Sequence, residues 1–234
     1  MAGRHWMIKF ARWHIWLGWL IGVPLVMWTL TGLVMVARPI EEVRGDHLRK
    51  AQDAPEAFTG NPRPIDFRLD GSQQYTEMRV TRQGDRLVWF LTRKDGSIER
   101  RPADMRQEEL PQIDDAYVRQ LVAQRIVGGD AIASIRRFSA EDAPFDLRRP
   151  IPSWQAALED GTHVYVHAET GEIAAVRTRF WRVFDFMWGL HIMDLQSRED
   201  TSHPILILFA ALALAGTILG SILMFRRRKS RVRA

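Results

Sequence analysis

Two long apolar segments lie near the two ends of the chain, and a polar region with short alternating patterns separates them. Residues 13–37 and 204–225 carry no formal charge. At about 1.5 Å of rise per residue, each segment is long enough to cross a bilayer as an α-helix. The pattern therefore predicts two transmembrane helices, one on each side of a central domain.

A cleaved signal peptide is the alternative interpretation of the first segment, because a short basic stretch at residues 1–12 precedes it. The apolar run is longer than the core of an ordinary signal peptide, and Met35 and Ala37 form a poor cleavage site. We therefore predict an uncleaved transmembrane helix over residues 13–37. Pro24 predicts a kink within it.

The polar region between the segments, residues 38–179, predicts an α+β domain. Its first part, residues 41–64, is rich in charge, proline and glycine, which is typical of a linker. Alternating apolar and polar positions then predict short strands. These candidate strands lie near residues 77–81, 87–92, 132–138, 153–158, 163–167 and 173–177.

A helix is predicted between the second and third of these strands. Asp114 and Asp115 precede a segment whose apolar residues recur at spacings of three and four, and both aspartates suit the N-terminal end of a helix. Gly128 and Gly129 end the pattern. The predicted order is a hairpin, a helix and an antiparallel meander.

The segment before the second apolar run has a different pattern. As a helix, residues 180–196 carry Arg182 and Asp185 on one side and mostly apolar side chains, together with His191, on the other. This amphipathic pattern predicts a helix that lies at the outer membrane–water interface. A polar connection at residues 197–203 then leads into the second transmembrane helix at residues 204–225.

The distribution of charge predicts the orientation of the chain. The sequence pI is about 10.0, yet all 28 acidic residues lie between Glu41 and Asp200. The flanks at residues 1–12 and 226–234 hold nine cations and no acid, which leaves 24 cations against 28 acids between them. Cations collect on the cytoplasmic side of short flanks. We therefore predict a bacterial inner-membrane protein with cytoplasmic termini and a periplasmic central domain. The basicity is then a topology signal, with no role in binding nucleic acid.

The run PSWQAALEDGTHVYVHAETGEIAAV at residues 152–176 resembles the end of a PepSY domain, in which two strands flank a turn of this type. Residues 114–178 are then similar to one PepSY unit, and residues 65–110 resemble a degenerate first unit. This arrangement between membrane helices resembles the PepSY-associated transmembrane proteins, a family that includes inner-membrane reductases of iron–siderophore uptake. Larger reductases of that family have more transmembrane helices than the two predicted here.

Three histidines lie near the predicted membrane. His14 lies about one turn inside the first helix, His191 on the apolar side of the interfacial helix, and His203 just before the second span. Neutral imidazole is the usual axial ligand of b-type haem, and an ionisable residue within a span marks a functional site by default. Gly18 and Gly22 follow His14 on one helix face and leave a groove for a flat macrocycle. These residues, with the family resemblance, predict haem b bound at the level of the membrane.

Each of these histidines also has a purely structural interpretation. His14 can contact a lipid phosphate, with Gly18 and Gly22 serving only as a small-xxx-small contact between helices. His191 can be a packed interfacial residue. His203 can be a solvent-exposed residue that caps the second helix. Helical rise places His14 about 30 Å from the outer end of its helix, so it cannot share an iron with His191 or His203 in one monomer. His191 and His203 lie at one level and can pair. His14 needs a partner from a second copy or another subunit, and Gly216 and Gly220 provide a close-packing face within the chain or in a homodimer.

The leading hypothesis is a haem-binding protein that passes electrons through the inner membrane to ferric siderophore in the periplasm. Two alternatives remain open: a membrane-anchored PepSY module that binds a partner without redox activity, and a subunit of a larger membrane reductase.

His163 and His167 lie about 13 Å apart along one predicted strand, which argues against a shared metal. The sequence carries no flavin, nicotinamide, phosphate-loop or metalloprotease motif, so any electron donor comes from elsewhere.

Overall fold

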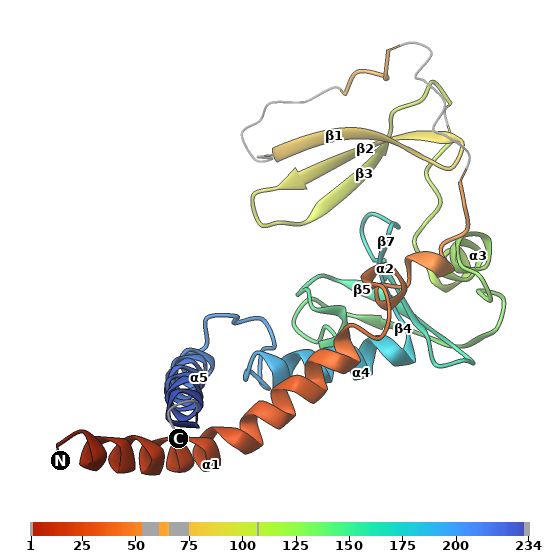
Figure 1. Ribbon diagram of the computed structural model, residues 1–234. Helices are drawn as coiled ribbons and strands as arrows, with labels where there is room; N and C mark the ends of the chain where they lie inside the picture. Colours follow the sequence, from red (N-terminus) through yellow and green to blue (C-terminus); the bar gives the residue numbers. More distant parts are fainter. Residues whose placement is uncertain (1, 53–60, 66–74, 107, 232–234) are drawn as a thin grey trace. The chain divides into compact units, whose positions relative to one another are not determined.

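The computed structural model describes residues 2–52, 61–65, 75–106 and 108–231 (Figure 1). The chain divides into two compact units. The helix unit consists of Met1–Pro39 and Arg182–Ala234, and the sheet unit consists of Ile40–Trp181. Parts of the predicted linker, of the degenerate first PepSY unit and of the basic tail lie outside the described residues.

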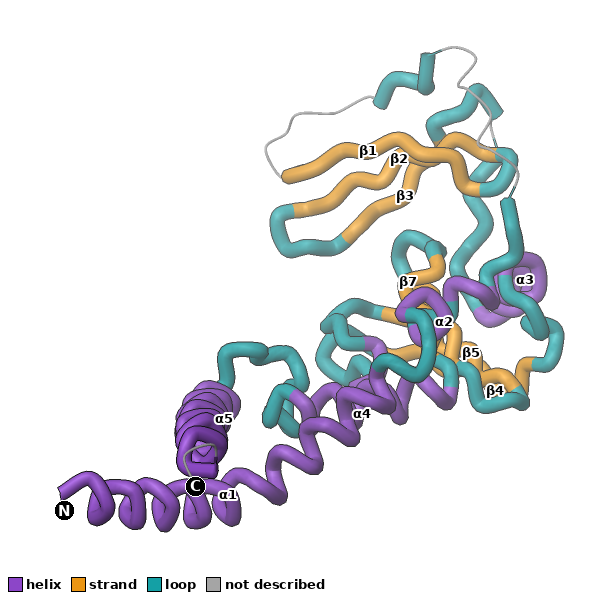
Figure 2. Tube along the Cα trace, in the orientation of Figure 1, coloured by secondary structure: helices purple, strands orange, loops and turns teal. Residues whose placement is uncertain are grey.

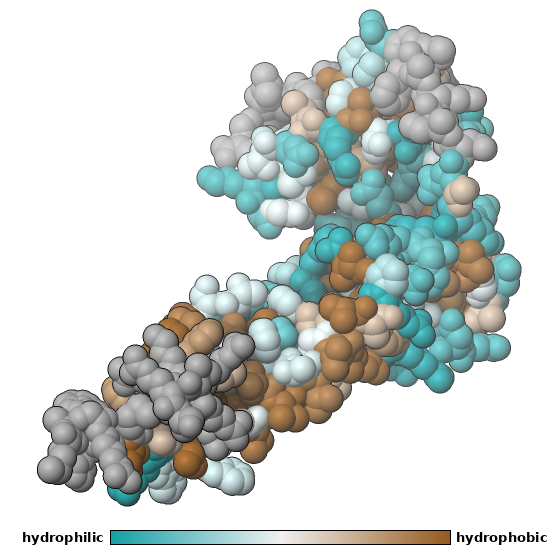
Figure 3. Space-filling model, in the orientation of Figure 1, coloured by the Kyte–Doolittle hydropathy of each residue, from teal (hydrophilic) through white to brown (hydrophobic). Residues whose placement is uncertain are grey.

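The helix unit contains the two predicted transmembrane helices. Helix α1 spans Ala2–Met35 and α5 spans Pro204–Arg231. Ile8–Met35 and Pro204–Phe225 are long and apolar enough to cross a membrane, and few of their side chains are buried within the chain. Such exposure of apolar side chains suits contact with lipid. In Figure 3 apolar surface gathers over these helices, whereas the sheet unit is mostly polar.

Helix α1 runs without interruption through Pro24. Figure 2 shows the helix changing direction partway along its length. A proline inside a helix removes one backbone hydrogen bond and is a common cause of such a bend. The structure therefore agrees with the predicted kink.

Helix α4 spans Arg179–His191, and the chain turns immediately after it. The carboxylate of Asp194 fixes this turn, because it accepts hydrogen bonds from the Ser197 hydroxyl and from the backbone N–H groups of residues 196, 197, 199 and 200. The Ser197 hydroxyl and these N–H groups hold the pKa of Asp194 well below its usual range. The connection from α4 to α5 is therefore an ordered turn.

The sheet unit contains two antiparallel sheets. The first has the order β1-β2-β3, with β1 at Tyr75–Gln83, β2 at Arg86–Arg93 and β3 at Ile98–Pro102. Gly84 and Gly96 provide the positive φ angles of its two turns. Two short helical turns, α2 (Ile40–Val43) and η1 (Asp46–Leu48), precede this sheet in the chain. The structure confirms the predicted hairpin and adds β3.

The second sheet follows helix α3, which spans Asp115–Arg125 and is capped by the Asp114 side chain on the N–H of Tyr117. Its strands are β4 (Ile132–Phe138), β5 (Ser153–Leu158), β6 (His163–His167) and β7 (Ile173–Arg177), hydrogen-bonded in that order. Val118 and Val122 of α3 pack on one face of the sheet, against a core that includes Val164 and Val166. The predicted α+β fold, with a helix followed by an antiparallel meander, is confirmed.

The opposite face of β6 supports a buried polar network. Tyr165 is fully buried and packs on Leu147 of the short helix η2, Phe145–Leu147. Its hydroxyl donates to the carboxylate of Asp146 and accepts from the Gln155 amide. His163 Nδ1 lies 3.0 Å from the same carboxylate. Burial, with the Asp146 carboxylate as the second cause, raises the pKa of the Tyr165 phenol, so the network fixes η2 with a neutral tyrosine.

Candidate functional site

His191, the last residue of α4, lies against α1 within the helix unit. Its Nδ1 atom is 3.0 Å from Thr31 Oγ1. The imidazole stacks on the Trp28 ring, with centroids 4.6 Å apart and planes inclined by 17°. A Cβ atom at Gly32 would lie only 3.3 Å from His191 Cε1, so the glycine leaves room for the ring. Three residues of α1 therefore hold this imidazole.

The hydrogen bonds of Thr31 favour one tautomer of His191. The Thr31 hydroxyl donates its single proton to the Trp28 carbonyl oxygen over 2.9 Å. In the tautomer that matches this donation, Nδ1–H of His191 donates to Thr31 Oγ1 and the lone pair lies on Nε2. Nε2 has no hydrogen-bond partner among the described residues. This is the arrangement of a metal-ligating histidine whose other nitrogen is fixed by a neighbour.

His14 packs on the second transmembrane helix. A Cβ atom at Gly220 would lie 2.8 Å from His14 Cε1 and 3.3 Å from Nε2, and one at Gly216 would lie 2.9 Å from the Ile21 side chain. The Gly216 and Gly220 pair therefore lets α5 approach α1 within the chain. His14 Nδ1 is buried without a hydrogen-bond partner in the described structure, an unusual state for a polar atom.

Gly18 and Gly22 border a separate, open surface of α1. A Cβ atom at either position would meet nothing within 4 Å. The sequence places His14, Gly18 and Gly22 on one face of the helix. In the structure His14 contacts α5, whereas Gly18 and Gly22 do not. They leave an uncovered strip of backbone beside His14.

His203 lies just before α5, and its Nδ1 is also buried without a hydrogen-bond partner among the residues described. No ring contact or hydrogen bond between His203 and His191 occurs in the described part of the chain.

His14 lies 17 positions before Thr31 in α1, a separation of about 25 Å along the helix axis. The helix unit therefore holds His14 and His191 at two distinct levels.

The contact between His14 and Gly220 predicts a position-specific effect of small substitutions. We expect Gly220→Ala to destabilise the helix unit by about 1 to 2 kcal/mol, because overpacking outweighs the gain in helix propensity. Gly22→Ala adds the same methyl group to an open surface and should be neutral or slightly stabilising. Thermal unfolding in detergent measures both. Adding His14→Ala to Gly220→Ala should restore stability, and equal midpoints for the two glycine variants would contradict the packing described.

The histidines of the sheet unit have structural partners. His163 and His167 lie on the same face of β6, as predicted, and each has its own hydrogen bonds. Burial lowers the pKa of His167, whose Nδ1 accepts from the N–H of Glu169. His47 is exposed in η1, and the His5 side chain lies outside the part described. The described residues contain no group of three or more His, Cys, Asp or Glu side chains that could hold a metal ion.

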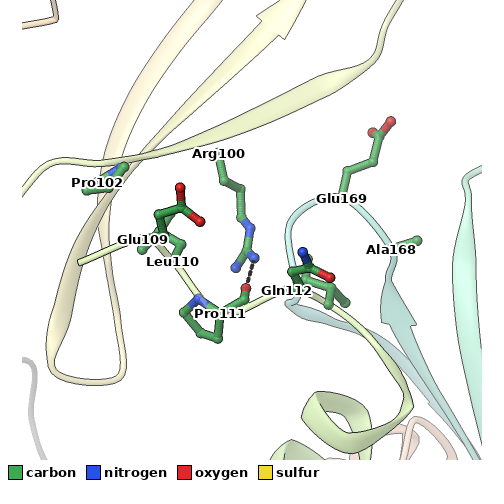
Figure 4. A pocket seen from close by; sticks show the side chains of 9 residues that line it. Arg100, Pro102, Glu109, Leu110, Pro111, Gln112, Ala168 and Glu169 are labelled. Atoms are coloured by element: carbon green, nitrogen blue, oxygen red, sulfur yellow. Dashed lines mark hydrogen bonds between the residues drawn. The ribbon is translucent and has the colours of Figure 1, made fainter. Parts of the chain in front are cut away.

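Two neighbouring pockets lie within the sheet unit. The smaller, of about 440 Å³, is lined by Arg100, Pro111 and Glu169, among others (Figure 4). Arg100 is engaged there, because it donates to the Pro111 carbonyl over 2.5 Å and to Gln83 Oε1 over 2.8 Å. The larger pocket is a cleft of about 560 Å³ between the β1–β2 hairpin, α3 and the segment at Arg49. Sequence patterns did not indicate these pockets, because their residues come from distant segments.

Two apolar helices of membrane-spanning length and an α+β unit between them define the class of a membrane-anchored protein with an extramembranous domain. The profile of the family described as the PepSY-associated TM region matches residues 11–234. The chain belongs to this family, which confirms the membrane anchoring and the PepSY resemblance. No curated protein and no solved structure matches the chain.

Proposed function

We propose that this protein binds haem b in the membrane and transfers electrons to ferric siderophore in the bacterial periplasm. The observation that carries the proposal is the imidazole of His191, whose Nδ1 is engaged by Thr31 while Nε2 has no hydrogen-bond partner among the described residues. Imidazole presented in this way is a typical axial ligand of b-type haem.

The residues of the helix unit fit a haem group chemically. His191 offers a nitrogen of fixed orientation, and the buried, unpartnered Nδ1 atoms of His203 and His14 are two further candidates. Gly18 and Gly22 leave backbone uncovered beside His14. Bound haem would supply a reversible one-electron couple, and the chain itself would hold the ligands and exclude water with apolar side chains.

The proposed orientation follows from charge. The two flanks of the helix unit carry cations and no acids, so we assign them to the cytoplasmic side of the inner membrane. The sheet unit then lies in the periplasm, where it would meet the acceptor. His14 is on the cytoplasmic side in this orientation, and its partner would come from a second copy of the chain or from another membrane subunit.

An absorption spectrum of the detergent-purified full chain, made in haem-replete cells, tests the proposal. We expect a Soret band and, after addition of dithionite, the sharp α band of a b-type haem with two strong-field axial ligands. Oxidation of the reduced protein by a ferric siderophore should reverse the change. A colourless, folded protein with no bound haem would exclude this function.

A second candidate is an anchored interaction module without redox activity. The cleft of the sheet unit favours it, because the cleft is open and the side chains of Gln120 and Gln124 that line it make no hydrogen bond with the described residues. A colourless and stable protein that co-purifies with a periplasmic partner would support this function over the first. A requirement for coexpression of a second chain before haem binds would instead indicate a subunit of a larger reductase.

A further inference from the structure

The cleft of the sheet unit is lined by more cations than anions. Arg82 and Arg86 come from the β1–β2 hairpin, Arg125 from the end of α3, and Arg49 from the segment after η1. Two carboxylates, Asp85 and Glu172, line the same cleft, and these are the only acids among the described residues that line it. The described part of the lining therefore carries excess positive charge.

The acids of the cleft already have cationic partners. Asp85 accepts from Arg106 over 2.6 Å, and this bond lowers the pKa of the Asp85 carboxyl. Glu172 lies 3.4 Å from Arg79. Neither Arg106 nor Arg79 lines the cleft, so both carboxylates are balanced by charges from outside it.

Two of the arginines are far less engaged than their neighbours. Arg86 is bound by the Asp104 carboxylate, with Nε 2.5 Å from Oδ2. In contrast, the Arg125 side chain makes no hydrogen bond or ion pair with the residues that the structure describes. Among the described residues the Arg49 guanidinium has only Asp46 as a partner, at 3.8 Å, and both side chains are about half exposed, so this ion pair contributes little to stability.

The backbone sets these two arginines beside each other. Arg49 forms an isolated antiparallel bridge with Ile126, and the N–H of Lys50 donates to the Arg125 carbonyl over 2.8 Å. The ammonium of Lys50 is used elsewhere, on the Ala123 carbonyl at the end of α3. Both arginines thus line the cleft from neighbouring, hydrogen-bonded backbone segments.

The remaining lining suits an organic ligand. Gln120 and Gln124, one turn apart on α3, are exposed and have no hydrogen-bond partner within the described ranges. The partly buried side chains of Leu121 and Ile173 provide apolar surface in the same cleft. The cleft volume lies in the range typical of sites for small molecules.

We propose that this cleft binds a small organic anion with two or more carboxylates, which pair with Arg49 and Arg125. Guanidinium groups bind carboxylates through two parallel hydrogen bonds, which an ammonium group cannot do. The glutamine amides can donate to further oxygen atoms, and the apolar side chains can contact the carbon skeleton. This site is independent of haem, because all of its residues belong to the sheet unit.

Calorimetric titration of the full chain in neutral detergent tests the proposal, with citrate as the probe and acetate and inorganic phosphate as comparisons. We expect saturable citrate binding below about 1 mM that weakens as salt is added. Arg49→Gln and Arg125→Gln should each weaken it at least about tenfold, because each removes one charge-assisted pair. Acetate and phosphate should bind much more weakly than citrate.

Arg119→Gln provides the matched control. Arg119 is an exposed residue of α3 that faces Asp115 at 3.5 Å and does not line the cleft, so its loss changes net charge equally. Gln124→Glu is a second test that removes no arginine and should also weaken citrate binding. No citrate binding, equal affinity in wild type and both arginine variants, or phosphate binding as tight as citrate binding would each overturn the proposal. The haem spectrum should be unchanged in every variant.

Discussion

His191→Ala is expected to retain less than about a tenth of the haem that the wild-type protein binds, measured as Soret absorbance per protein. The substitution removes the imidazole that Thr31 and Trp28 hold against α1. Added imidazole should restore part of the absorbance, because it can occupy the space left by the ring. Such rescue would separate loss of a ligand from loss of the fold.

His47→Ala is the matched control for this experiment, because His47 is exposed and belongs to the sheet unit. It should keep the full spectrum. Thr31→Val removes the acceptor for Nδ1–H and should lower haem occupancy or shift the reduction potential, whereas Thr31→Ser should preserve both. Full haem content in His191→Ala would remove His191 from the ligand set.

Asp146→Ala is expected to destabilise the sheet unit by about 2 to 3 kcal/mol. The fully buried Tyr165 hydroxyl would lose its acceptor and keep only the Gln155 donor. The same carboxylate also fixes His163, so the change weakens the contact between η2 and the sheet at two points. Thermal unfolding followed by far-ultraviolet circular dichroism should show a midpoint lowered by roughly 5 to 10 °C.

Asp142→Ala removes a carboxylate four residues away that is exposed and bonded only weakly to Ser139 over 3.3 Å. Its midpoint should stay within about 1 or 2 °C of wild type. Indistinguishable midpoints for the two variants would contradict the role assigned to the buried network.

The elements that sequence patterns predicted best are those with a strong local signal. Alternation in the meander strands and the Asp114 cap of α3 are short-range features, and the structure has them within a residue or two of the predicted positions. Strand β3 was not predicted, because Ile98–Pro102 carries three charges and a proline and has no alternating pattern. Its pairing with β2 is a tertiary effect.

The candidate site was predictable only as a set of residue types. Sequence position indicated membrane-level imidazoles, but Thr31 and His191 are 160 residues apart, and no periodic pattern relates them. The same limit applies to the glycines. Gly18 and Gly22 had the more conspicuous spacing around His14, yet Gly220 from the other end of the chain is the glycine that the imidazole contacts.

The helix unit is assembled from the first and last parts of the chain, and this has a consequence for biosynthesis. Helix α1 leaves the ribosome long before Gly220 exists, and at about 10 residues per second the interval is roughly 20 seconds. During that time His14 and Ile21 lack the surface on which they finally pack. A chaperone or insertase that shields this helix face would therefore act on the nascent chain before its last transmembrane segment is made.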